Sequence, residues 1–204
     1  SKGHLTIGGC DTVELASIYG TPLYVMDEPT IRQALRDYKR SIDQHYEQGG
    51  RVHYASKACS FKEMYRILQQ EGCGADVVSG GELYTAMQAG FPADNICFHG
   101  NNKSAAEIKM GLDYGIGRFA VDNVTELQMI SDIASAMGKT AAIYLRITPG
   151  VDAHTHDFIK TGVIDTKFGF TLENGEAMEG VKQALQMPGV ELKGLSCHIG
   201  SQIF

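Results

Sequence analysis

The stretch RVHYASKACSFKEMYRILQQEGCGADVVSGGEL, residues 51–83, contains the unit that decides the fold. Arg51–Ala55 and Ala75–Val78 are short apolar runs, which predict two strands. Between them, apolar residues recur at helical spacing: Phe61, Met64, Tyr65 and Leu68. A strand, a helix and a second strand in this order predict a βαβ unit and therefore a parallel sheet.

The same alternation continues toward the C-terminus. Further strands are expected at Asn95–Phe98, Arg118–Val121, Ala141–Ile147 and Val190–Cys197. Helices are expected over Glu82–Ala89, after a capping box at Ser104–Glu107, after Asn123 and over Glu173–Gln186. No clear period is visible from Thr148 to Phe170. The repeats from His53 onward give six strands, whereas a closed (β/α)8 barrel needs eight, so an open doubly wound sheet remains an alternative.

The N-terminal part is organised differently. Asp11 is expected to cap a short helix that ends at Gly20, and Leu23–Met26 is expected to form a strand. Thr30 is expected to cap a long helix with one apolar face, and Gly49-Gly50 to end it.

Composition narrows the functional class. The 204 residues are 43% hydrophobic and 21% charged, as in globular proteins, and the net charge is −6. This charge argues against a general nucleic-acid binder, and no apolar run is long enough to span a membrane. The N-terminus lacks the apolar core of a signal peptide. The five cysteines are scattered and odd in number, which favours reduced thiols in a cytoplasmic protein.

Distinctive polar residues follow the predicted strands. Lys57, Asp76, His99, Arg146 and His198 lie at or just after strand ends, where α/β folds bind ligands. Lys57 is the most informative, because burial at the mouth of a sheet would lower the pKa of its amine and make it a Schiff-base nucleophile. A surface lysine is the alternative for Lys57 taken alone.

Two other patterns carry less information. His154-Thr155-His156-Asp157 contains a chelating His-x-His pair, but no third ligand lies at a fixed spacing, so no metal site is expected. Gly80-Gly81 precedes a helix but lacks the full spacing of a dinucleotide-binding motif.

Five blocks together resemble a known family. They are Tyr54-Ala55-Ser56-Lys57-Ala58, Asp76-Val77-Val78-Ser79-Gly80-Gly81-Glu82-Leu83, His99-Gly100-Asn101-Asn102-Lys103, Lys167-Phe168-Gly169 and His198-Ile199-Gly200-Ser201-Gln202. In this order they resemble the diaminopimelate decarboxylases. These are fold-type III pyridoxal-phosphate enzymes, related to ornithine and arginine decarboxylases and to alanine racemase. The third and fifth blocks favour the diaminopimelate branch.

This resemblance implies an architecture. The cofactor would lie in an alanine-racemase-like (β/α)8 (TIM) barrel, followed by a separate C-terminal β domain. Residues 1–28 would contribute a strand to the β domain, and residues 29–204 would form a partial barrel of about six strands. The family's chain is about twice as long, so the C-terminal β domain would be absent here. The unclosed edge of the barrel would then favour aggregation or a rearranged dimer.

The resemblance also implies site residues for pyridoxal 5'-phosphate. Lys57 would form the Schiff base with the cofactor, His198 would stack on its ring, and Ser201 would contribute to binding its phosphate. Three further residues match positions that line the cofactor pocket of related decarboxylases, and a fourth packs beside it: Asp76, Glu82, Arg146 and Ala55.

The implied reaction is the decarboxylation of meso-2,6-diaminopimelate to L-lysine by a cytoplasmic homodimer. The family's active-site cysteine and substrate arginines would lie beyond residue 204, so this chain alone is expected to be inactive. Other functions stay open: another fold-type III decarboxylase acting on ornithine or arginine, a racemase, or a non-enzymatic pyridoxal-phosphate-binding barrel protein.

Overall fold

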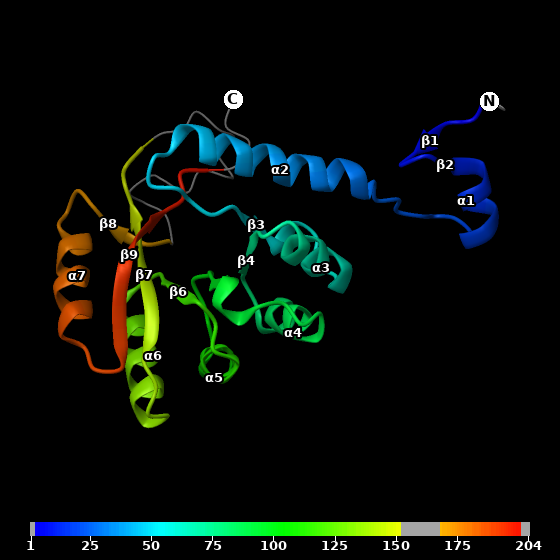
Figure 1. Cartoon of the computed structure of the whole chain (residues 1–204). Coiled ribbons are helices and arrows are strands. Elements are labelled where there is room, and N and C mark those ends of the chain that lie inside the picture. Colours follow the sequence, from blue (N-terminus) through cyan, green and yellow to red (C-terminus); the bar gives the residue numbers. More distant parts are fainter. Residues whose placement is uncertain (1–2, 152–167, 201–204) are drawn as a thin grey trace. The chain divides into compact units, whose positions relative to one another are not determined.

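The computed structural model describes residues 3–151 and 168–200, which form two compact units. The first unit consists of residues up to 52 together with 70–73, and the second of 53–69 together with the residues from 74 onward. The first unit contains β1 (Thr6–Ile7), β2 (Cys10–Asp11), α1 (Thr12–Tyr19) and α2 (Glu28–His45) (Figure 1). β1 and β2 form an antiparallel pair.

The predicted helix α1 is confirmed, since Asp11 accepts hydrogen bonds from the backbone of Val13 and Glu14 and Gly20 ends the helix. The predicted cap of α2 is wrong. Asp27 is the capping residue, and its carboxylate accepts hydrogen bonds from both the backbone and the hydroxyl of Thr30. Thr30 therefore lies in the first turn of α2.

The segment Leu23–Met26, where the sequence predicts a strand, pairs with no other strand among the described residues and forms none there. Tyr24 is 98% exposed, and its neighbours Leu23 and Met26 are exposed as well. An extended segment becomes a strand only through hydrogen bonds to a neighbouring strand, and no such neighbour lies among the residues described here, so pairing with a β domain stays a prediction.

The second unit alternates strands and helices. Its strands are β3 (His53–Ala55), β4 (Gly74–Val77), β5 (Ile96–Phe98), β6 (Arg118–Val121), β7 (Ala141–Thr148), β8 (Phe170–Thr171) and β9 (Val190–Cys197). Its α-helices are α3 (Lys62–Gln70), α4 (Gly80–Gln88), α5 (Ala105–Tyr114), α6 (Val124–Ala136) and α7 (Glu176–Gln186). Short 3-10 turns occupy η1 (Ser56–Ala58) and η2 (Ala93–Asn95).

Several predicted element ends are confirmed, and others shift by one to three residues, as at α4, which begins at Gly80 instead of Glu82. Ser104 and Glu107 form the predicted capping box of α5, and Asn123 caps α6. One strand, β8, was missed because it is only two residues long and follows a stretch without a period. Helix α7 begins at Glu176 instead of Glu173, after Gly175 with a left-handed backbone.

The sheet of the second unit is parallel throughout, and β3 to β7 lie side by side in chain order (Figure 1). β9 pairs with β7 along the length of β7, and β8 pairs with the last two residues of β7. Ile147 of β7 is paired with both β8 and β9, so these two strands lie on opposite edges of β7. β8 therefore continues the edge that β6 occupies at Ile143–Leu145.

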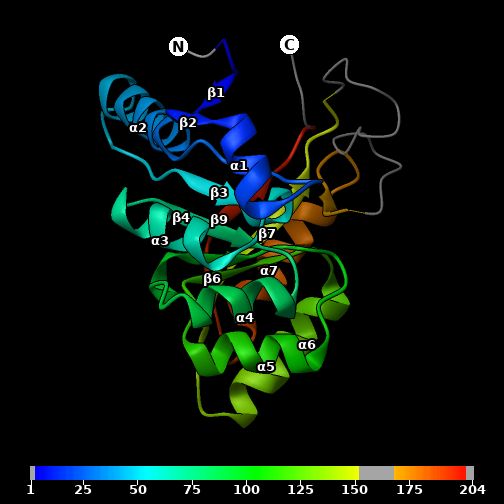
Figure 2. The same cartoon turned by 90° about the vertical axis from the view of Figure 1, so that its right-hand side faces the viewer.

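The helices cover one face of this sheet. Side chains that alternate onto the helix side are buried almost completely: Ala75, Val77, Ile96, Phe98, Phe119, Val121, Ile143 and Leu145. Figure 2 shows α4, α5 and α6 on the same side of the sheet. Residues on the other face, such as Asp76, Arg118 and Tyr144, are polar and only half-buried.

A doubly wound sheet carries helices on both faces, whereas a barrel carries them only outside. The one-sided cover and the chain-order strands therefore identify a partial (β/α)8 barrel, as predicted. β3 and β9 are not paired with each other in the part of the chain described. Among the described helices, none combines the length and the apolar character that crossing a membrane would require.

Candidate functional site

The lysine singled out by sequence lies in η1, directly after β3. Its neighbour Ser56 is buried, and the Oγ of Ser56 lies 2.8 Å from the carbonyl oxygen of Asp76 and 2.5 Å from Oε2 of Glu82. Both are acceptors, so the hydroxyl donates its proton to one of them. Lys57 itself is exposed. These contacts of Ser56 hold the turn that carries Lys57, while the side chain of Lys57 stays accessible to solvent.

Glu82 also helps to hold the turn that carries Lys57. It is in the first turn of α4, which Ser79 caps by accepting the backbone N–H of Glu82. Its carboxylate also accepts the backbone N–H of Val78 at 3.0 Å. The predicted pocket residue Glu82 therefore contacts the backbone and the buried Ser56, and its link to Lys57 runs through Ser56.

Asp76 lies between two imidazoles on the uncovered face of the sheet. Its Oδ1 is 2.9 Å from Nδ1 of His53, and its Oδ2 is 3.5 Å from Nε2 of His99. Burial lowers the pKa of His99, and the positive charges of Lys103 and Arg146 lower it further, against the raising effect of Asp76. His99 is accordingly neutral at neutral pH. Ala55, on the neighbouring strand β3, lies beside Asp76 as its register partner.

Arg146 extends from β7 on the same face. Its side chain is 11% exposed, and burial lowers the pKa of its guanidinium. The guanidinium carbon lies 4.4 Å from the ring centre of Phe168, and Nη1 is 3.7 Å from Oδ1 of Asp122. The other carboxylate oxygen of Asp122 accepts the backbone N–H of Gly169. Among the described residues Oδ1 of Asp122 is buried and accepts no hydrogen bond.

His198 follows β9. Burial lowers the pKa of its imidazole, and the charges of Arg146 and Lys57 add to this effect. The three side chains therefore share one electrostatic neighbourhood, although they come from three different strand ends. Ser201, which was predicted to bind phosphate, lies outside the described residues, as do His154, His156 and Asp157.

Two buried charged residues near the strand ends, Lys103 and Asp122, were not among the predicted site residues. Lys103 donates to the carbonyls of Gly100 and Ala120 and to Glu126, each at 2.7 Å. Asp122 directly follows β6. The rule that found Arg146, position at the carboxyl end of a strand, applies equally to Asp122.

Comparison with known proteins gives three findings. Residues 29–204 match the sequence model of the pyridoxal-binding domain of pyridoxal-dependent decarboxylases. The diaminopimelate decarboxylase of Halalkalibacterium halodurans is 54% identical over 203 residues, which is 100% of this chain and 46% of that protein. The crystal structure of diaminopimelate decarboxylase from Methanocaldococcus jannaschii with L-lysine has a TM-score of 0.89 and 43% identity, covering 99% of this chain and 47% of that one.

A more distant structure is the lysine/ornithine decarboxylase of Vibrio vulnificus complexed with putrescine. It has a TM-score of 0.73 and 27% identity, and the match covers 93% of this chain and 45% of that one. The chain thus spans about half the length of the curated relatives it matches.

Proposed function

The chain belongs to the family of pyridoxal-dependent decarboxylases, and from this premise we propose that it carries the lysine-bearing part of a diaminopimelate decarboxylase. The reaction is removal of one carboxylate of meso-2,6-diaminopimelate, which leaves L-lysine. The observation that carries the proposal is the 54% identity over the whole chain to a diaminopimelate decarboxylase. The lysine/ornithine enzyme, at 27%, gives the alternative of a different substrate much weaker support.

The side chains at the strand ends fit pyridoxal phosphate. An exposed primary amine at Lys57 can bond to an aldehyde, and the flat ring of His198 can stack on another flat ring. The guanidinium of Arg146 suits an anionic group of a ligand. When bound, the cofactor supplies a sink for the electron pair that the departing carboxylate leaves behind.

The chain's own residues hold the reacting groups in place. Ser56 and Glu82 fix the turn that aims Lys57. Asp122 lies behind Arg146 and also binds Gly169, so it ties the guanidinium to the start of β8. The low pKa of His198 keeps its imidazole neutral, which favours stacking over ion pairing with phosphate.

Three further parts of the proposal rest on the family resemblance. They are a homodimer, a cytoplasmic location and a division in which residues 1–28 belong to a β domain and 29–204 to the barrel. The exposed apolar side chains of Leu23, Tyr24 and Met26 support the division, because a partner sheet would cover them.

The test uses protein made from the complete reading frame that encodes this chain. We expect release of CO2 from meso-diaminopimelate and, after borohydride treatment, a reduced cofactor adduct on Lys57. Lys57→Ala should lower kcat to below about a thousandth, because the nucleophile is lost. Lys62→Ala, an exposed lysine at the start of α3, is the matched control and should keep both activity and adduct.

Other outcomes would contradict parts of the proposal. CO2 release from ornithine in preference to diaminopimelate would reject the substrate. An adduct on Lys57 without any decarboxylation would favour a cofactor-binding protein that is not an enzyme. An adduct that persists in Lys57→Ala would reject the assignment of the nucleophile.

A further inference from the structure

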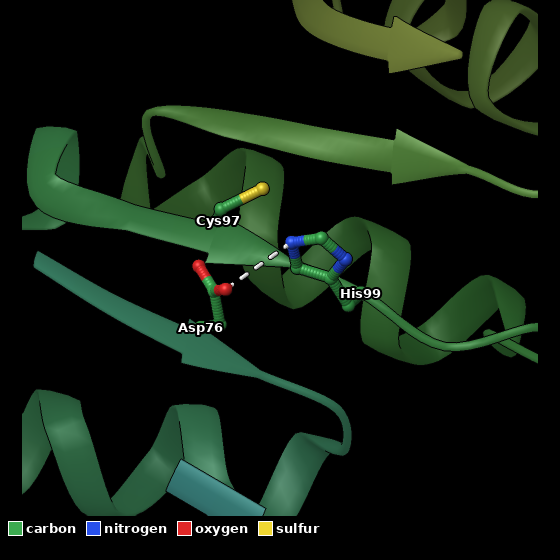
Figure 3. A group of neighbouring side chains, drawn as sticks. All are labelled: Asp76, Cys97 and His99. Carbon is green, nitrogen blue, oxygen red and sulfur yellow. Dashed lines mark ion pairs between the residues drawn. The ribbon is translucent and has the colours of Figure 1, made fainter. Parts of the chain in front are cut away.

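Three side chains of metal-binding type meet on the uncovered face of the sheet. Asp76 comes from β4, Cys97 from β5, and His99 directly follows β5 (Figure 3). One ligand atom of each residue lies within 4.8 Å of the other two. No ligand-spacing motif in the sequence indicates this group, because its members come from two strands. Only the folded sheet brings them together.

The distances suit a tetrahedral ion. Zn²⁺ binds oxygen and nitrogen ligands at about 2.0–2.2 Å, so two such ligands of one ion lie roughly 3.3–3.5 Å apart. Oδ2 of Asp76 and Nε2 of His99 are 3.5 Å apart. A thiolate, with its longer bond of about 2.3 Å, would lie roughly 3.6 Å from each of them. The observed limit of 4.8 Å allows this after a side-chain movement of about 1 Å.

The packing around the group also suits a metal, and the ion would have to overcome the burial that raises the pKa of the Cys97 thiol to about 12. Cys97 is 3% exposed. A Zn²⁺ ion with one thiolate, one carboxylate and one neutral imidazole is uncharged as a whole, which limits the cost of burial. His53 holds the second oxygen of Asp76, as outer-shell partners commonly hold ligating carboxylates.

We propose that Asp76, Cys97 and His99 form a binding site for Zn²⁺, with a fourth position open to water. On binding, the thiol of Cys97 releases its proton to solvent and its sulfur binds the metal, so that no oxidant or reductant is involved. The proposal goes beyond the decarboxylase function, and it shares Asp76 with the residues that the family resemblance implies for the cofactor pocket.

Cobalt(II) serves as the spectroscopic probe for this site, and zinc(II) competes with it. The protein from the complete reading frame, without added cofactor, is titrated with cobalt(II). We expect a sulfur-to-cobalt charge-transfer band in the near ultraviolet, which zinc(II) abolishes. The band should be absent in Cys97→Ala and retained in Cys73→Ala, which removes another buried cysteine.

Affinity for zinc(II) supplies a graded readout. Loss of an outer-shell partner costs about 10–100-fold in metal affinity, so His53→Gln should weaken binding by that factor. Cys97→Ala and His99→Gln should each weaken it by more than about 100-fold. His45→Gln, on the exposed end of α2, should change nothing.

Three results would overturn the proposal. The first is a charge-transfer band of equal strength in Cys97→Ala, with circular dichroism showing a folded variant. The second is a native spectrum without any thiolate band. Unchanged zinc(II) affinity in both His53→Gln and His99→Gln would likewise reject these ligands, and these two variants leave the thiol untouched.

Discussion

Lys103 provides the sharpest test of how the loop after β5 is held. The side chains of Lys103 and Glu126 are 1% and 4% exposed, and their charged atoms are 2.7 Å apart. Lys103 also donates to the carbonyl oxygens of Gly100 and Ala120. Lys103→Met leaves all three acceptors without this donor. Removing one partner of a buried ion pair costs about 3–5 kcal/mol, so we expect a loss of this size.

The assay is unfolding by urea, followed by circular dichroism. With a slope of about 2 kcal/mol per molar urea, the expected loss moves the midpoint down by roughly 2 M. Burial already raises the pKa of Glu126, and loss of the ammonium raises it further. The folded variant then holds more protons than the unfolded chain above about pH 4.3. Its stability should therefore fall as pH rises, by up to about 1.4 kcal/mol per unit.

The deficit of Lys103→Met should consequently be larger at about pH 8 than at about pH 5.5. Lys109→Met, on the exposed side of α5, is the control and should be neutral within about 0.5 kcal/mol. The double variant Lys103→Met with Glu126→Leu should recover part of the stability, since it leaves no unpaired buried charge. A deficit below about 1 kcal/mol, or one independent of pH, would refute the reasoning.

Two further predictions concern packing and charge. A Cβ at Gly74 would lie 2.5 Å from the ring of His53, so Gly74→Ala should cost about 1–3 kcal/mol in urea unfolding. A Cβ at Gly81 would meet only Oγ of Ser79, at an ordinary contact distance of 3.8 Å, so Gly81→Ala should not destabilise; equal costs would contradict this. The guanidinium of Arg36 helps lower the pKa of Glu71 to about 2, so the stability it provides is present above about pH 4.5 and lost as pH falls toward 2. Glu71→Gln should therefore unfold more easily than the native protein at neutral pH, and the difference should vanish in acid.

Local signals predicted most of the second unit. The strands Arg118–Val121 and Val190–Cys197 have the predicted ends, and Ser104 caps α5 as expected. Each of these signals depends on residues within one turn or one run of chain. The choice between an open sheet and a barrel needed the structure, because which face the helices cover depends on how successive units pack.

The differences between prediction and structure lie where a partner segment decides the local conformation. Leu23–Met26 has a strand-like composition but no neighbouring strand among the described residues. Thr30 is a good capping residue, yet the carboxylate of Asp27 accepts the backbone N–H of Thr30, so the helix begins three residues earlier than predicted. β8 is too short to give a period, and its place is set by β7 and by Asp122.

For the candidate site, the positions of polar residues at strand ends predicted which side chains lie near one another but not what each side chain contacts. Lys57, Arg146 and His198 share one electrostatic environment, as predicted from their places. The expectation that Lys57 is buried was wrong, since its side chain is exposed. The contact of Glu82 with Ser56 joins the segments that follow two neighbouring strands, so no pattern within one stretch of sequence predicts it.

The polarity of the uncovered face is built into the strands themselves. Barrel interiors are usually filled by branched apolar side chains. Here His53 lies opposite Gly74 across β3 and β4, and Tyr144 lies opposite Gly194 across β7 and β9. Gly74 leaves the room that the ring of His53 occupies, and a Cβ at Gly194 would touch the ring of Tyr144 at 3.4 Å. The ring of His53 then meets Asp76, and the hydroxyl of Tyr144 accepts a hydrogen bond from Arg118. Because these polar groups are paired within the sheet, the face can stay polar without leaving them unsatisfied. The loops at the strand ends therefore hold their ligand-binding residues next to a charged surface.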